Sequence, residues 1–184
     1  DKLFDYIKNP FYLNEYLRLY NEKQEISYIE FKNELWNRVI LKSKPAREQC
    51  FMELAFDRVN SGQFFIKPNC ETRILEELRN DGIIGYESPY GYFIAHDIHE
   101  EWALDKIVEA EFIKGSDNKI FFENIGSNLP IRRAFRKWLS EKLFYNNAQI
   151  KTFIEQTLQN VEIPSFWKDE ILVAVLLSDY SDRF

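Results

Sequence analysis

The sequence predicts a mainly α-helical protein that carries a small β-hairpin, and three observations lead to this fold class. Glycine (6) and proline (6) are few among the 184 residues, whereas phenylalanine and tyrosine are abundant, which favours helices over a β-sandwich. Apolar residues recur at helical spacing along most of the chain. The segment Tyr90–Glu100 differs, because its aromatic and apolar residues 92–95 are typical of a buried strand that leads into a helix.

Residues 1–44 are predicted to form a small helical domain. Pro10 interrupts the apolar pattern, so we expect a short helix, a break near Asn9, and a second helix with Pro10 in its first turn. A polar connection is expected over 21–25. Ser27 and Glu30 then have the spacing of a capping box, which predicts a third helix that continues to about Ile40.

Residues 45–114 are predicted to alternate helices and strands. A helix begins at Pro45 and ends at Ser61-Gly62, and a second begins at Pro68-Asn69, with Cys70 on its buried face and Gly82 at its C′ position. Strands are expected over 63–67, 83–87 and 92–95, the last two joined by a turn at 88–91. This order of helix, strand, helix, strand, turn and strand resembles a winged helix.

The next helix is expected to run from Asp97 to about Ile113. Asp97 stands where an N-cap belongs, and Glu100 is placed at the spacing of a capping box. Apolar residues cover most of its circumference, so we place it between the winged-helix unit and the C-terminal region. Residues 115–184 are predicted to be a third region of three or four helices joined by short loops, similar to the opening of an α-solenoid.

Charge, cysteines and hydropathy limit the partners and the compartment. The net charge of −6 predicts no generic attraction to nucleic acid or anionic lipid. Cys50 and Cys70 lack metal-site spacing, and we interpret them as reduced thiols of a cytoplasmic protein, with a single disulfide as the alternative. The longest apolar run, 171–177, is too short to cross a bilayer. Because the chain starts at Asp1 without a methionine, we expect a piece of a longer polypeptide.

His96 and Asp97 are the first candidate site. They come after the strand end Phe93-Ile94-Ala95 and precede a helix. In this the sequence resembles the regulatory half of STAND-type P-loop ATPases (the NB-ARC and NACHT proteins), whose winged helix ends in a His-Asp signature, with methionine where this chain has Ala95. The resemblance implies that His96 reaches the β-phosphate of bound ADP and that Asp97 caps the helix and orients the histidine. A structural histidine beside a capping aspartate also fits, and His99 is expected to face solvent or its own helix.

Asn9 and Pro10 are the second candidate site. In the same family a Gly-x-Pro motif at a helix start lays its proline against adenine. Here the segment 7–13 keeps the Asn-Pro-aromatic-Leu character, with Lys8 where glycine is usual. The resemblance spans about residues 5–110, and it implies that Asn9 and Pro10 contact the same ADP as His96.

The chain lacks the residues that would hydrolyse a nucleotide. The sequence contains no GxxxxGK[ST] phosphate loop and no apolar strand that ends in an aspartate for Mg²⁺. We therefore expect a non-catalytic chain with no metal site and no cofactor of its own. The resemblance implies that an ATPase domain preceding Asp1 holds the ADP or ATP and is the intramolecular partner of these residues.

A basic run forms a third candidate site, for a partner rather than a nucleotide. Its residues share one face of a helix: Arg132, Arg133, Arg136 and Lys137. This face predicts docking of an acidic protein or a nucleic-acid backbone, and the plainer interpretation is a solvated face paired with neighbours such as Glu141. DNA readout by the winged helix itself is disfavoured, because residues 61–100 carry three basic against seven acidic residues.

These observations support three functional hypotheses. The leading hypothesis is a regulatory segment of a cytoplasmic STAND-like signalling ATPase that senses the nucleotide state through its winged helix, with a protein partner on its C-terminal helices. The second is a winged-helix nucleic-acid binder that uses the helix from Arg132 to Lys137. The third is a helical scaffold for protein interactions.

Overall fold

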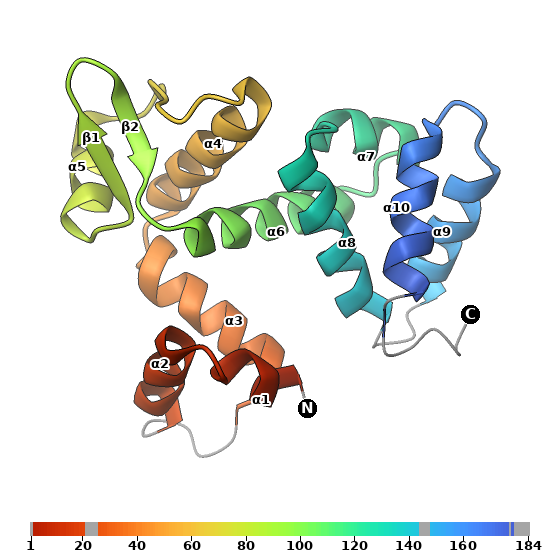
Figure 1. Cartoon of the computed structure of the whole chain (residues 1–184), viewed down its shortest axis with the longest axis horizontal. Coiled ribbons are helices and arrows are strands. Elements are labelled where there is room, and N and C mark those ends of the chain that lie inside the picture. The colour runs from red at the N-terminus through yellow and green to blue at the C-terminus, as the bar shows by residue number, and fades with distance from the viewer. Residues whose placement is uncertain (1, 21–25, 144–147, 177, 179–184) are drawn as a thin grey trace.

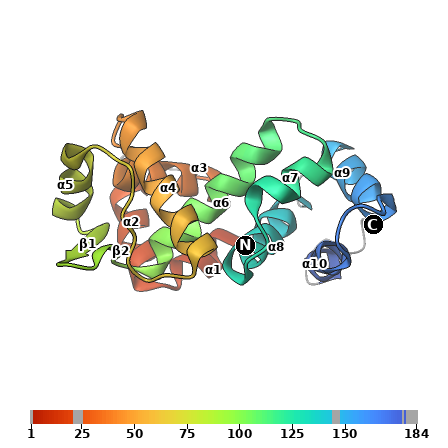
Figure 2. The same cartoon turned by 90° about the horizontal axis from the view of Figure 1, so that it is seen from above.

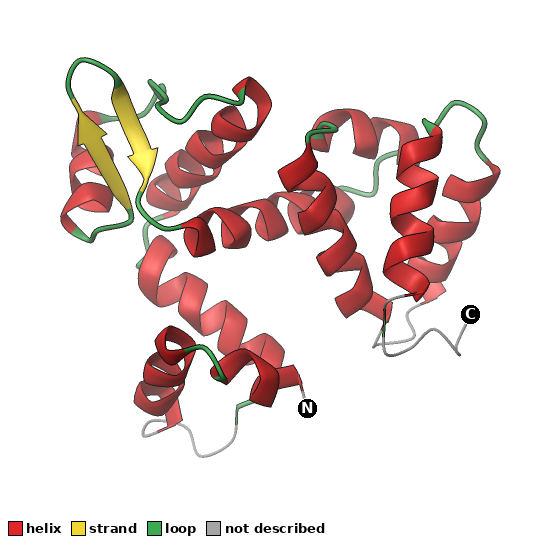
Figure 3. Ribbon diagram, in the orientation of Figure 1, coloured by secondary structure: helices red, strands yellow, loops and turns green. Residues whose placement is uncertain are grey.

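The computed structural model describes residues 2–20, 26–143, 148–176 and 178. Within these ranges the chain is mainly helical and has one two-stranded antiparallel sheet (Figure 3), which confirms the predicted fold class at this level. The polar connection predicted over 21–25 lies outside the described residues. In chain order the elements are α1 (Lys2–Ile7), α2 (Pro10–Tyr20), α3 (Tyr28–Trp36), the π-helix η1 (Asn37–Leu41), α4 (Pro45–Ser61), α5 (Thr72–Asn80), β1 (Ile84–Glu87), β2 (Gly91–Ile94), α6 (Asp97–Ile113), α7 (Asn118–Ile125), α8 (Leu129–Leu143), α9 (Ala148–Gln159) and α10 (Ser165–Leu176).

Several helix ends form as local sequence predicts. The Ser27 hydroxyl accepts from the backbone N–H of Glu30, whose carboxylate accepts from the backbone N–H of Ser27, so the predicted capping box is confirmed. Helix α4 ends where Gly62 adopts φ +66°, a left-handed conformation that glycine tolerates. Helix α5 closes with a Schellman motif. The backbone N–H of Gly82 donates to the Arg79 carbonyl, and the backbone N–H of Ile83 donates to the Leu78 carbonyl.

The third helix departs from the expected single α-helix, because α3 gives way to η1 at Asn37. The side chain of Arg47, only 1% exposed, binds the carbonyls at this end. Its Nε donates to the Ile40 oxygen at 2.6 Å and its terminal nitrogen to the Val39 oxygen at 3.1 Å. The same guanidinium pairs with Asp81 at 2.6 Å. A buried charge is tolerated when it is paired and hydrogen-bonded in this way.

The predicted strand over 63–67 is wrong. Its residues contribute one isolated bridge, in which Ile66 exchanges both backbone hydrogen bonds with Tyr92. In this register Pro68, which has no N–H, stands opposite Tyr90 in the turn before β2, so the ladder does not extend in that direction. Helix α5 also starts later than predicted, at Thr72, so Cys70 lies in the preceding loop rather than on the helix.

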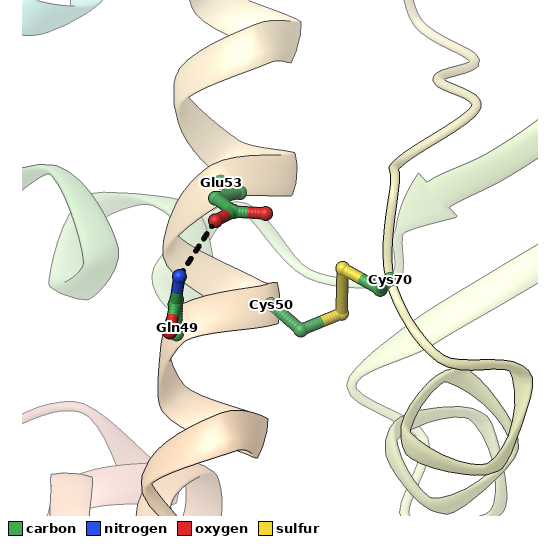
Figure 4. Close-up of a disulfide and its surroundings, with 4 residues drawn as sticks. All are labelled: Gln49, Cys50, Glu53 and Cys70. Atoms are coloured by element: carbon green, nitrogen blue, oxygen red, sulfur yellow. Dashed lines mark hydrogen bonds between the residues drawn. A yellow bond between two sulfur atoms is a disulfide. The ribbon is translucent and has the colours of Figure 1, made fainter.

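The expectation of reduced thiols is wrong as well. Cys50 of α4 and Cys70 are joined by a disulfide, with their Cα atoms 5.7 Å apart (Figure 4). Sequence alone left this alternative open, since two cysteines 20 residues apart give no signal until the fold brings them together. Disulfides are uncommon in a reducing cytosol, so this bond counts against the predicted cytoplasmic location.

Two hydrophobic cores share helix α6. The first core takes buried residues from α2 through β2 and ends on α6 with Trp102 and Ala103. The second begins on α6 with Leu104 and Val108, adds Val59 of α4, and continues through α7–α10. Figures 1 and 2 show α6 running from the hairpin end of the molecule to the group of four C-terminal helices. The first core thus draws on both the predicted 1–44 domain and the predicted 45–114 domain, whose boundaries remain predictions.

Candidate functional site

The start of α2 is shaped by Asn9. Its side-chain oxygen accepts a hydrogen bond from the backbone N–H of Phe11 at 2.9 Å, and its carbonyl accepts from Leu13 at 3.0 Å. Asn9 therefore caps the helix, and Pro10 is its first residue, where a missing N–H does no harm. Both residues are exposed, so their outer surfaces are open to a ligand or to another domain.

The start of α6 differs from the prediction in its capping. His96, in extended conformation (φ −139°, ψ 132°), is the N-cap residue and makes no side-chain cap hydrogen bond, whereas Asp97 is the first helical residue. The predicted capping box of Asp97 and Glu100 is therefore wrong. Glu100 instead pairs with Arg58 of α4, which draws its carboxylate away from the helix end. Asp97 is exposed in the first turn, where a negative charge complements the helix dipole.

Of the two positions expected for His99, solvent and its own helix, the first is wrong, because the residue is only 4% exposed. Its ring lies 5.4 Å from the Trp102 ring and 5.6 Å from the His96 ring. Burial lowers the pKa of His99 to about 4, and the neighbouring His96 acts in the same direction. Its Nδ1 has no hydrogen-bond partner among the described residues. His99 is thus a neutral buried imidazole, while His96, three residues earlier, is exposed.

Trp102 brings the two motifs of the predicted nucleotide site together. Its ring lies 6.0 Å from Phe11 and 6.1 Å from Tyr12, and its indole N–H donates to the Tyr12 hydroxyl at 3.0 Å. On its other side it contacts His99 and, through that ring, His96. The beginning of α2 and the beginning of α6 therefore adjoin in the folded chain. Sequence reasoning missed Trp102 as a site residue, although its spacing of three residues from His99 places these two side chains on the same side of the helix.

The basic run divides into two pairs. Arg132 and Arg136 both bind the carboxylate of Glu170 in α10, at 2.8 and 2.6 Å. Glu170 is only 5% exposed, so these two arginines compensate a buried charge. Arg133 is exposed and Lys137 lies 3.7 Å from Glu101 of α6. Glu141, expected as a partner of this run, pairs instead with Lys32 and Tyr28 of α3.

A pocket of about 420 Å³ lies between α6 and α8 and joins two of the candidate sites. Asp97 lines it from α6, and Arg133 and Lys137 line it from α8. Acidic residues outnumber basic ones, since Glu100, Glu101 and Asp105 also contribute. The pocket therefore favours a ligand with hydrogen-bond donors or positive charge over an isolated anion.

A second pocket, of about 300 Å³, lies between α3, α6 and α8, and three of the four tryptophans line it: Trp36, Trp102 and Trp138. An ionic network closes one side. The ammonium group of Lys32 lies 2.8 Å from both Asp105 and Glu141. Burial by itself lowers the pKa of Lys32, but the two carboxylates outweigh it and raise that pKa above its ordinary value. Tyr28 donates to Glu141 at 2.8 Å and completes the network.

Comparisons with known proteins assign no family: no protein-family model and no curated protein matches the chain. Among the described residues, no group of three or more histidine, cysteine and acidic side chains is arranged to hold a metal ion. In the same ranges, no helix combines the length and the apolar character that spanning a membrane requires.

Proposed function

We propose that the chain is a non-catalytic regulatory segment of a STAND-like ATP-binding signalling protein. In this proposal residues 1–44 are a helical domain, 45–114 a winged-helix module, and 115–184 the opening of an α-solenoid array that meets a protein partner. An ATPase domain preceding residue 1 supplies the phosphate loop and the Mg²⁺ site, so the segment itself is not an enzyme.

The observation that carries this proposal is the meeting of the α2 start and the α6 start through Trp102. The two motifs of the resemblance are almost ninety residues apart in sequence, and a shared nucleotide requires them to adjoin in space. His96 is exposed beside this contact, and an imidazole N–H can donate to a phosphate oxygen. Asn9 and Pro10 then contact the adenine end of an ADP molecule that the ATPase domain mainly holds. Loss of these contacts frees the helical array.

The test is retention of ADP by the full-length protein. His96→Ala is expected to lower the ADP that copurifies with the protein and to favour the active state. Arg79→Ala, a change at an exposed residue near the end of α5, is the matched control. It should leave the amount of copurifying ADP and the population of the active state unchanged. Residues 1–184 alone should bind ADP only weakly in calorimetry, because most contacts belong to the other domain. Unchanged ADP retention in His96→Ala, or tight binding of ADP by the segment alone, would contradict the proposal.

A helical interaction scaffold is the second candidate, and the tryptophan-lined pocket between α3, α6 and α8 favours it. Buried aromatic rings beside paired charges are typical of surfaces that anchor a partner side chain. Trp36→Ala and Ile113→Ala, at the floor and the exposed rim, should weaken a stable partner complex while His96→Ala leaves it intact. The nucleic-acid alternative has less support, since Arg132 and Arg136 already bind Glu170.

A further inference from the structure

The pocket between α3, α6 and α8 has a charge arrangement that the proposed nucleotide role does not use. On one wall the ammonium group of Lys32 lies 2.8 Å from the carboxylates of both Asp105 and Glu141, and each of the three side chains is less than a fifth exposed. Because two negative charges share a single positive one, this network keeps a net charge of −1. A further positive group beside it is therefore favourable.

Lys106 lines the same pocket but does not supply that charge. Its ammonium group donates to the side-chain oxygen of Asn33 at 3.0 Å and lies 5.9 Å from the centre of the Trp36 ring. In the part of the chain that the structure describes, it forms no ion pair. Burial lowers the pKa of Lys106, although the Asp105 carboxylate acts in the opposite direction. An anion next to Lys106 would stabilise its charged form.

The remaining charged residues of the pocket compensate each other. Glu109 pairs with Lys142 at 2.8 Å and accepts a hydrogen bond from the indole N–H of Trp138. Three lysines and three acidic residues thus line the pocket, which is neutral as a whole but has a negative centre and a positive centre. A ligand that carries one charge of each sign matches this arrangement better than a simple cation or a simple anion.

Apolar surface lies beside these charges. The three tryptophans at the floor are between 2% and 7% exposed, so they form a fixed base. At the rim, Ile29 and Ile113 are 38% and 70% exposed and can contact an apolar group of a ligand. The volume of about 300 Å³ is at the lower end of the range for ligand pockets and suits a small molecule.

We propose that this pocket binds a free α-amino acid with a large apolar side chain. The α-ammonium group pairs with the carboxylates of Asp105 and Glu141, which share one lysine. The α-carboxylate pairs with Lys106. The side chain packs on Ile29 and Ile113 at the rim.

The same pocket supports the second candidate function, in which a side chain of a partner protein fills it. A residue within a polypeptide has neither a free α-ammonium group nor a free α-carboxylate, so it lacks both charges that the pocket accommodates. A capped amino acid therefore separates the two interpretations. The residues of the proposed nucleotide site, Asn9, Pro10, His96 and Asp97, do not line this pocket, so the inference is independent of that role.

The experiment is isothermal titration calorimetry of the chain with L-phenylalanine. We expect saturable binding with a Kd of about 1 mM or below. The intrinsic fluorescence should change on binding, because three of the four tryptophans line the pocket. Four analogues should each bind about tenfold more weakly or worse: 3-phenylpropionate lacks the ammonium group, phenethylamine lacks the carboxylate, N-acetyl-L-phenylalaninamide lacks both charges, and glycine lacks the side chain.

A variant tests the carboxylate contact from the side of the protein. Lys106→Met should weaken the binding of L-phenylalanine about tenfold or more, and it should leave the weak binding of phenethylamine unchanged, because that ligand has no carboxylate. Lys151→Met, at an exposed residue of α9, is the matched control and should bind L-phenylalanine as the wild type does. His96→Ala should also bind it normally.

The analogues probe the unaltered protein, so the test does not depend on how well a variant folds. Three outcomes overturn the proposal. L-phenylalanine gives no saturable binding, or an analogue without one of the charges binds as tightly as L-phenylalanine, or Lys106→Met binds it as the wild type does. Tight binding of the capped amino acid would favour the partner side chain instead.

Discussion

The indole N–H of Trp102 donates to the hydroxyl of Tyr12 at 3.0 Å, across 90 residues of sequence. The same hydroxyl accepts from Tyr6 at 2.7 Å, and the rings of Tyr6 and Tyr12 stack at 3.8 Å. Burial raises the pKa of Tyr6 to about 12, so its hydroxyl stays protonated and able to donate at physiological pH. This hydroxyl pair joins α1 and α2 to α6, and it places the two predicted nucleotide motifs side by side.

Tyr12→Phe should therefore destabilise the protein by about 1–3 kcal/mol. The change removes the acceptor of two donors, the indole of Trp102 and the hydroxyl of Tyr6, and leaves them in an apolar environment. Urea unfolding monitored by circular dichroism measures the difference. Tyr20→Phe, on an exposed part of α2, is the matched control and should change stability by about 0.5 kcal/mol or less. Equal effects of the two changes would contradict the role of the hydroxyl pair.

Lys32→Met should cost about 3 kcal/mol or more. Lys32, Asp105 and Glu141 are each less than a fifth exposed, and removal of the shared cation leaves two carboxylates buried without their partner. Lys142→Met is the control, because the pair of Lys142 with Glu109 is about one-third exposed and should contribute about 0–1 kcal/mol. Thermal unfolding of both variants measures the contrast. A Lys32 variant as stable as the Lys142 variant would show that the network does not hold α3 to α6 and α8.

Reduction of the Cys50–Cys70 disulfide should lower the free energy of unfolding by about 3 kcal/mol, because the bond closes a loop of 20 residues in the unfolded chain. Unfolding with and without dithiothreitol measures this difference. In the Cys50→Ser/Cys70→Ser variant the reductant should have no effect. Two thiols that react with Ellman's reagent in the folded, unreduced protein would contradict the bond.

The stability of the protein should fall as the pH drops from about 7 to about 4, in part through His99. Burial holds the pKa of His99 at about 4, below the ordinary 6.5 that it regains on unfolding. Between these two pH values the unfolded chain binds a proton at His99 that the folded chain does not bind. The contribution of His99 to the free energy of unfolding is therefore complete above pH 6.5 and is lost as the pH falls toward 4. Between about pH 7.5 and about pH 5 the loss amounts to roughly 2 kcal/mol.

His99→Phe isolates this contribution, since it keeps a buried ring and removes the titrating group. Its stability, measured by urea unfolding across the same range, should depend less steeply on pH than that of the wild type. The carboxylates titrate in both proteins and cancel in the comparison. Parallel profiles would show that His99 is not held neutral by burial.

Much of the helical structure could be predicted from sequence because its signals are local. A capping box at Ser27, a proline at position 45 and a glycine at position 82 each act on the neighbouring turn. The predictions of a strand over 63–67 and of a capping role for Asp97 were wrong, because local signals did not decide them. In each case a distant partner decides the outcome: within 63–67 only Ile66 pairs with β2, and the Glu100 carboxylate pairs with Arg58.

The candidate site shows the same division. Sequence pointed to Asn9, Pro10, His96 and Asp97, but not to Trp102, whose role exists only where α2 lies against α6. It also left His99 between solvent and its own helix, since a histidine in a helix gives no sign of what will cover it.

The sequence by itself determined the helical class, the hairpin and most helix ends, because propensity, capping and turn chemistry act over a few residues. Only the tertiary structure decided that Cys50 meets Cys70, that Arg132 and Arg136 compensate Glu170, and that α6 serves two cores. Such contacts depend on which surfaces are buried together, and burial is a property of the whole chain.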